Sequence, residues 1–254
     1  MMDTFSYAET HIGRRAHNED WYGISEDVGL FVVADGMGGY DGGEVASRIA
    51  VTAVDAFYRD ADLGASSETD DLFLKKSRMD TAFRLANLEV RRHRHGRFSK
   101  MGSTLSAMLI EEDRALIGHV GDSRVYRFRR GRLRQLTADH SLVMALKNAG
   151  MSDVIVSRLG HIITRAIGVH ESTAPDIVIE RVLPGDRFLL CTDGLTDVVQ
   201  DEVIEAVMRD VPVCDVCSTL VREALKRGGD DNITALLVEV VDDAPTVREF
   251  AAAL

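Results

Sequence analysis

The sequence predicts an α+β fold in which antiparallel sheets and helices pack as layers. The chain has 254 residues, 45% hydrophobic and 28% charged, a balance that allows a full hydrophobic core. Short runs rich in β-branched residues are bounded by Gly, Asp or Pro, as strands are. These runs and the helical stretches occur in groups instead of alternating one to one, which disfavours a doubly wound parallel sheet.

The predicted strands cover residues 30–35, 103–110, 114–121, 123–129, 176–183, 186–192 and 232–240. Gly131 follows one of these strands and predicts a hairpin turn to another. Apolar stripes predict long helices at 44–60 and 69–94, and shorter helices are expected at 139–149, 200–209 and 213–227. Because the Ala244-Pro245 step breaks the last strand, we expect residues 242–254 to form a peripheral tail.

Charge and hydropathy exclude several classes of partner. The formal net charge is −11, so we expect no nucleic-acid ligand, because no basic stripe balances the phosphates. No apolar run is long enough to cross a membrane, and the N-terminus lacks the pattern of a signal peptide. We therefore expect a cytoplasmic monomer without a membrane partner.

Two local features leave alternatives open. Cys214 and Cys217 have the spacing of a redox or zinc pair but stand alone in an amphipathic stretch. A core or neutral role therefore competes with a thiol or metal role. With Cys191 the cysteines number 3, which argues against a disulfide framework. The basic run from Arg91 to Arg97 is either the solvated end of a helix or a docking or RNA-binding patch.

Carboxylates recur at the ends of the predicted strands, with glycines beside most of them. Side chains at strand ends can converge in a sandwich, and glycine lets backbone carbonyls approach a ligand. An all-oxygen cluster suits Mg²⁺ or Mn²⁺ better than zinc or copper. A single Asp-Gly also fits an ordinary turn, but its recurrence at strand boundaries favours a metal site. The residues are Glu19-Asp20, Asp35-Gly36, Asp122, Asp193-Gly194 and Asp230-Asp231.

Several segments, taken in order, resemble the protein phosphatase 2C-like (PPM) family of metal-dependent Ser/Thr phosphatases, and its bacterial members most. The resemblance covers about residues 4–240 and implies a four-layer α-β-β-α sandwich with two mostly antiparallel sheets. It also implies one catalytic domain over residues 1–241, with a flap at about 144–170. The segments are RAHNED (15–20), VVADGMGGYDGGEVAS (32–47), MGSTLSAMLI (101–110), HVGDSRVYRFRRGRLRQLTADHS (119–141), ITRAIG (163–168), LLCTDGLTDVV (189–199) and GGDDNITALLVEV (228–240).

The resemblance implies a site for two Mn²⁺ or Mg²⁺ ions, with a third, weaker one. Asp35 would bridge the two ions, and the Gly36 carbonyl would bind one of them. Asp193 and Asp231 would hold the other ion. Asp122 resembles the residue that, with Asp193, holds the third ion in bacterial relatives.

The resemblance also assigns roles around the metals. Glu19 and Asp20 would reach metal-bound waters, and Asn232 would orient Asp231. Arg15 would grip the substrate phosphate as a bidentate fork, a task that its planar guanidinium suits.

One position departs from the eukaryotic members, which carry histidine where this chain has Met37. Methionine cannot protonate a leaving alcohol, so the general acid is unassigned. A water on the third metal near Asp122 is the first candidate, ahead of His17 and His140.

The implied activity is hydrolysis of phosphoserine or phosphothreonine on proteins by a metal-bridged water. The expected partners are phosphorylated proteins, among them a bacterial Ser/Thr kinase and its targets. Two alternatives stay open: a catalytically silent module that binds phosphoproteins, and a metallo-hydrolase of small phosphate esters. The polar 144–170 segment is either a lid that selects substrates or an ordinary surface helix and loop.

Overall fold

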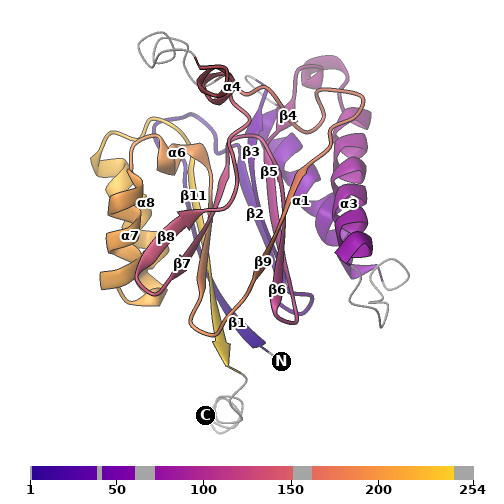
Figure 1. Cartoon of the computed structure of the whole chain (residues 1–254). Coiled ribbons are helices and arrows are strands. Elements are labelled where there is room, and N and C mark those ends of the chain that lie inside the picture. Colours follow the sequence, from indigo (N-terminus) through magenta and orange to yellow (C-terminus); the bar gives the residue numbers. More distant parts are fainter. Residues whose placement is uncertain (1, 39–41, 61–71, 151–161, 243–254) are drawn as a thin grey trace, which may run out of the picture.

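Two antiparallel sheets stack face to face and helices cover their outer faces (Figure 1). This computed structural model describes residues 2–38, 42–60, 72–150 and 162–242. One sheet has the order β1 (Met2–His11), β11 (Ile233–Asp242), β10 (Arg187–Cys191), β7 (Arg124–Arg129) and β8 (Arg132–Gln135). The other has the order β2 (Asp20–Ser25), β3 (Leu30–Met37), β5 (Leu105–Glu111), β6 (Arg114–Val120) and β9 (Asp176–Arg181), with β4 (Gly102–Ser103) on β3.

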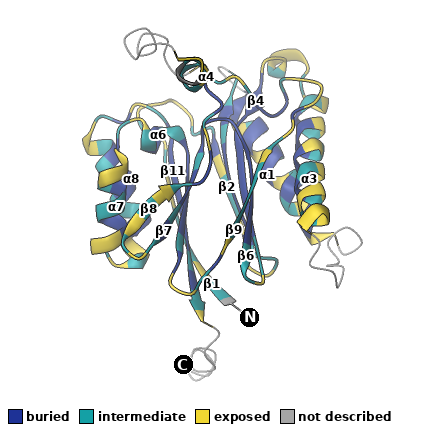
Figure 2. Cartoon of the chain, viewed as in Figure 1, coloured by how far each residue is buried: buried dark blue, intermediate teal, exposed yellow. Residues whose placement is uncertain are grey.

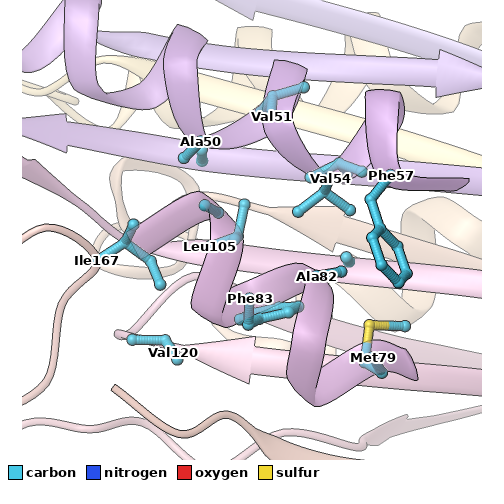
Figure 3. Packing of buried hydrophobic residues seen from close by; sticks show 14 of the residues in the cluster. Ala50, Val51, Val54, Phe57, Met79, Ala82, Phe83, Leu105, Val120 and Ile167 are labelled. Atoms are coloured by element: carbon cyan, nitrogen blue, oxygen red, sulfur yellow. The ribbon is translucent and has the colours of Figure 1, made fainter. Parts of the chain in front are cut away.

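Two long helices cover the sheet that contains β3. They are α1 (Gly43–Arg59) and α3 (Leu72–Arg92), and their apolar stripes pack on that sheet (Figure 3). Val54, Met79 and Phe83 are fully buried in this layer. The contact is so close that a Cβ at Gly118 of β6 would lie 2.6 Å from the Phe83 ring.

Shorter helices cover the sheet that contains β11. Met208 and Leu220 pack with Leu237 of the sheet in a second core. A third core, which includes Phe31 and Phe188, fills the space between the two sheets. Burial is thus concentrated in the facing strands and the inner sides of the helices (Figure 2). The helices are α6 (Asp193–Thr196), α7 (Asp201–Asp210), the 3₁₀ turn η2 (Val213–Asp215) and α8 (Val216–Lys226).

The four-layer α-β-β-α sandwich is therefore confirmed, as are the predicted strands and helices within a few residues. The hairpin predicted at Gly131 is confirmed as well: β7 and β8 pair through Arg130 and Gly131, which have φ angles of +52° and +77°. Two positive φ angles in a two-residue loop match the twist of an antiparallel pair. None of the described helices is long and apolar enough to span a membrane.

The sequence did not predict β1 and β2. β1 pairs with β11 along ten residues, from Met2 opposite Asp242 to His11 opposite Ile233. Most of its described side chains are partly or fully exposed, because it is an edge strand, so no apolar run marks it. The centre of the expected flap (151–161) and the tail after residue 242 lie outside the described residues. Just before residues 151–161, α4 (Leu142–Asn148) is found where a short helix was expected.

Replacing a buried ring of the α3 layer tests this core. We expect Phe83→Ala to lower the free energy of unfolding by about 3–5 kcal/mol, because it removes a buried ring and leaves a cavity. Leu88→Ala, on the same helix but 42% exposed, should lower it by less than about 1 kcal/mol. Urea unfolding followed by circular dichroism measures both, and equal losses would contradict the packing described above.

Candidate active site

The acidic residues predicted from the sequence lie at one end of the sandwich, the end marked by α6 and β4 in Figure 1. In antiparallel strands the end of one strand lies beside the start of the next. Asp20 begins β2 and pairs directly with Asp35 near the end of β3. Asp193 follows β10, and Asp231 precedes β11, which pairs with β10. Strand pairing within each sheet, and the stacking of the sheets, thus bring the four carboxylates together.

Asp20 is the most deeply buried of them and connects the two sheets. One oxygen, Oδ2, accepts hydrogen bonds from the hydroxyls of Thr192 (2.8 Å) and Thr234 (2.7 Å). The other, Oδ1, is buried and has no hydrogen-bond partner among the described residues. Burial raises the pKa of Asp20 to about 7, and the charges of Asp193 and Asp231 add to the rise.

Asp35 is held through its backbone. Its N–H donates to Thr104 Oγ1 (2.8 Å), and its carbonyl accepts from Ser103 Oγ (2.9 Å). Burial of the carboxyl raises the pKa of Asp35 well above its usual value, and the charges of Asp20 and Asp193 raise it further. A hydrogen bond to Asp193 acts in the same direction. The two carboxyl groups therefore meet directly.

Asp122 lies in the loop between β6 and β7 and is 5% exposed. Burial and the charge of Asp193 raise the pKa of Asp122 to about 7, and its Oδ1 has no hydrogen-bond partner in the part of the chain that is described. It lines a cavity of about 100 Å³ together with Asp193, Asp197 and Asp139. Asp139 is neutralised there by Arg124, whose Nη2 lies 2.7 Å from its carboxylate.

Arg15 lies at the mouth of the site. Its Nη2 donates to Asp231 Oδ2 at 2.7 Å, and the Arg15 side chain is 59% exposed. The neighbouring pair Arg14–Asp230 (2.9 Å) points outward, with side chains 71% and 76% exposed. Only Asp231 of the two adjacent aspartates thus faces the other carboxylates.

Asn232 acts in a different way from the expected one. The backbone N–H of Asn232, and not its side chain, donates to Asp231 Oδ1 (2.8 Å). The side-chain oxygen accepts from the Glu19 N–H (2.8 Å), and the side-chain amide donates to the carbonyls of Ile12 and His17 (both 2.9 Å). Asn232 therefore fixes the loop that carries Arg15 and Glu19.

The side chain of Glu19 lies against the N-terminus of α1, beside Gly43. A backbone hydrogen bond from Gly43 holds its carboxylate, where a helix N-terminus favours negative charge. Burial nevertheless raises the pKa of Glu19. The Glu19 carbonyl accepts from the Gly36 N–H (3.1 Å), and a Cβ at Gly36 would lie 2.0 Å from the Gly43 carbonyl oxygen. Only glycine fits at position 36.

Neither histidine that was considered as a general acid is arranged for that role in this structure. His140 Nδ1 accepts from the Gly121 N–H (3.0 Å), and its Nε2 faces Arg165 (2.7 Å) and Asp176 (3.2 Å). Both ring nitrogens of His140 are therefore engaged, Nδ1 by the backbone of Gly121 and Nε2 by the side chains of Arg165 and Asp176. His17 is exposed, and Met37 lies in β3 opposite Gly102.

The chemistry of these groups fits divalent cations. Each buried oxygen of Asp20 and Asp122 that lacks a partner needs a proton or a cation, and carboxylate oxygens are the ligands that Mg²⁺ and Mn²⁺ prefer. Among the described residues, no three acidic, histidine or cysteine side chains form a finished metal cage. Instead Asp35 meets Asp193 through a hydrogen bond, as crowded carboxyl groups do when a proton substitutes for a cation.

The profile of the family described as Protein phosphatase 2C matches residues 8–237 of this sequence. The chain belongs to the protein phosphatase 2C family. The resemblance seen in the sequence is thereby confirmed.

Individual members of the protein phosphatase 2C family are similar over most of the chain. Serine/threonine protein phosphatase PstP of Mycobacterium tuberculosis is 35% identical over 236 residues, which are 90% of this chain and 43% of that protein. The chain thus spans less than half the length of that relative. Serine/threonine phosphatase stp of Listeria monocytogenes is 33% identical and is covered over 91% of its length by 89% of this chain.

A solved structure of the family has the same fold. The crystal structure of the PstP catalytic domain, in complex with two manganese ions, superposes with a TM-score of 0.81 at 33% sequence identity. The match covers 95% of this chain and all (100%) of that one.

Sequence reasoning missed the residues that hold the carboxylates. Thr192 and Thr234 bind Asp20, Thr104 binds the Asp35 backbone, and Asp139 neutralises Arg124. Thr192 directly follows β10, and Thr104 lies between β4 and β5. A hydroxyl residue at the end of a strand is common, so its presence alone does not predict a role in the site. Their partners are distant in sequence, so no local pattern identifies them.

The raised pKa of Asp122 predicts how the metal-free protein responds to pH. In the unfolded chain this carboxyl titrates near 3.9, so the folded state binds the extra proton between about pH 4 and pH 7. We expect Asp122→Asn to stabilise the protein in EDTA by an amount that grows as the pH rises through this range and is constant above it.

Urea unfolding of both proteins between pH 4 and pH 8 measures the difference. Asp230→Asn is the control, because Asp230 is exposed, and it should show no such trend. A stabilisation by Asp122→Asn that shrinks with rising pH would contradict the burial effect.

Proposed function

We propose that the chain is a metal-dependent protein serine/threonine phosphatase that hydrolyses phosphoserine and phosphothreonine on proteins. The observation that carries the proposal is the meeting of four carboxylates from both sheets, with Arg15 at the edge of the cluster on Asp231. Membership of the protein phosphatase 2C family supports it. We also propose that residues 1–241 form one catalytic domain.

The proposed ligand set consists of Asp35, the Gly36 carbonyl, Asp193 and Asp231 for two Mn²⁺ or Mg²⁺ ions. Asp122, with Asp193, would hold a third. When bound, such ions supply positive charge for the phosphate and lower the pKa of bound water. The crystal structure of PstP with two manganese ions, which shares this fold, supports the assignment.

The chain's own residues would perform the remaining steps. Arg15, exposed at the mouth and only singly paired to Asp231, can present its planar fork to the phosphate oxygens. Asp20 and Glu19, whose pKa values are raised by burial, can accept or hold protons of water beside the reacting phosphate. As the general acid we prefer a water near Asp122 to either histidine, because both ring nitrogens of His140 are engaged and His17 is exposed.

The openness of the site supports a protein substrate. Arg15 and Arg14 are exposed on a surface that a protein can reach, as hydrolysis of side-chain phosphates on another protein requires. Phosphorylated proteins, including a Ser/Thr kinase and its targets, are the proposed partners, and a cytoplasmic monomer is the proposed form. Small phosphate esters alone, or binding without turnover, are the competing outcomes.

Hydrolysis of p-nitrophenyl phosphate and of a phosphothreonine peptide tests the proposal. We expect turnover of both with Mn²⁺ and none with EDTA, because the site then lacks the charge that activates water. Asp231→Asn should lower kcat by on the order of 100-fold or more, as loss of a group that acts on transition-state charge does. Asp35→Asn and Asp193→Asn should behave alike.

Asp230→Asn is the matched control, since it changes the adjacent aspartate, whose side chain points outward. It should leave kcat within about threefold of the wild type. Turnover in EDTA, or equal loss in both variants, would refute the assignment. Nucleotide hydrolysis without peptide hydrolysis would support the small-ester alternative, and peptide binding without turnover the silent module.

Replacing Arg15 tests the phosphate-binding role separately. Arg15→Ala should raise KM for the phosphopeptide roughly tenfold or more, because it removes hydrogen bonds between charged groups. Arg15→Lys should recover part of the loss, since lysine keeps the charge but not the fork. Steady-state kinetics with saturating Mn²⁺ measure both, and an unchanged KM in Arg15→Ala would exclude the role.

A further inference from the structure

The basic segment predicted as a helix end or a docking patch lies beside the candidate active site. Residues 91–100, which we name the basic rim, end α3, form the 3₁₀ turn η1 (Gly96–Phe98) and lead into β4. β4 pairs with β3: Gly102 lies opposite Met37 and Ser103 opposite Gly36. Gly36 directly follows Asp35, so the basic rim borders the carboxylate cluster (Figure 1).

One arginine fixes the shape of the basic rim. Arg94 donates from Nε and Nη2 to the Ser99 carbonyl (3.1 and 2.9 Å) and from Nη1 to the carbonyls of Gly168 (2.6 Å) and Val169 (3.1 Å). A Cβ at Gly168 would lie 2.3 Å from Val90, so this packing is tight. Arg94 is thus a structural residue that anchors the loop to the end of the 162–169 segment.

The neighbouring basic side chains point to solvent. The exposed residues are Arg92, His93, His95, Arg97 and Lys100. The arginines and Lys100 carry positive charge on a protein with a net charge of −11. Arg92 is partly neutralised by Glu89 (2.5 Å), and Arg97 stacks over Phe98.

An ordinary helix end explains only part of this charge. Cations near a helix C-terminus interact favourably with the helix dipole, which accounts for Arg91 and Arg92 in the last turn of α3. The dipole effect fades within one turn. Arg97 and Lys100 lie beyond the helix, on the side that leads to β4, and this explanation does not cover them.

We propose that the basic rim binds acidic side chains of the phosphoprotein substrate, beside the phosphorylated residue being hydrolysed. This inference rests on the proposed function. Favourable charges at the rim also offset the repulsion between an acidic enzyme and an acidic substrate.

A peptide fits the rim better than RNA does. The rim is one short segment, and carboxylates adjoin it: Glu89 within α3, and Glu19 and Asp35 at the site. A nucleic-acid backbone needs many cations in a continuous track, because each phosphate carries a charge. A peptide with one or two anionic groups needs only a local patch.

The test compares two phosphothreonine peptides, one with glutamates on both sides of the phosphothreonine and one with alanines at the same positions. The variant combines Arg92→Gln, Arg97→Gln and Lys100→Gln. We expect it to lower kcat/KM for the acidic peptide on the order of tenfold through KM, since each exposed ion pair contributes a factor of roughly two. Hydrolysis of the alanine peptide and of p-nitrophenyl phosphate should be unchanged, and high salt should remove the wild type's preference.

The control variant, Arg132→Gln with Arg181→Gln and Arg222→Gln, removes the same charge from exposed positions on β8, β9 and α8, and should keep the preference. No preference in the wild type, or equal losses in both variants or on both peptides, would overturn the proposal. So would displacement of the acidic peptide by a single-stranded RNA at a lower concentration than by free acidic peptide. If p-nitrophenyl phosphate is not hydrolysed with Mn²⁺, the proposed function is wrong. Binding of the two peptides, measured by fluorescence anisotropy, then tests the basic rim independently of turnover.

Discussion

The mutual repulsion of buried carboxylates is the constraint on which the rest of this site depends. Burial raises the pKa values of Asp20 and Asp35, and the charge of Asp193 raises both further, because burial and like charge both oppose ionisation. A fold that gathers such groups is less stable than one that separates them, unless protons or cations are bound. The raised pKa values of Asp20 and Asp35 correspond to the first of these solutions, the binding of protons. The second is the one that the proposed activity uses.

In Asp20 and Asp35, some atoms position the residue and others face the carboxylate cluster. In Asp20 one oxygen is committed to two threonine hydroxyls that join the sheets, while the other has no partner among the residues described. Asp35 is positioned by its backbone through Thr104 and Ser103, which leaves its carboxyl to the cluster. Asp20 is thus positioned by one carboxylate oxygen and Asp35 by its backbone, and in both residues a carboxylate oxygen is left for the cluster.

Charge is also divided between the centre and the edge of the site. The centre is acidic and suits cations, whereas Arg15 and the basic rim provide positive charge where an anionic substrate would approach. Glycines make this proximity possible: Gly36 and Gly38 leave no room for a side chain between β3, α1 and the rim. The acidic centre and its basic edge therefore lie on adjoining segments at one end of the sheet, as expected when functional residues are carried by loops on a rigid scaffold.

The sequence by itself determined the layered α+β class, most strands and helices, and the acidic residues at strand ends, because periodicity and strand-end glycines are local signals. It did not determine β1 and β2, two edge strands without a continuous apolar run, which are recognisable only once β11 and β3 pair with them. Nor did it determine that Asp231 faces inward while Asp230 faces out, or that Asn232 holds the loop of Glu19. Those facts depend on contacts between residues more than 200 positions apart, such as Arg15 with Asp231. Only tertiary structure decides them, because the pairing of β1 with β11 brings the loops beside these strands together.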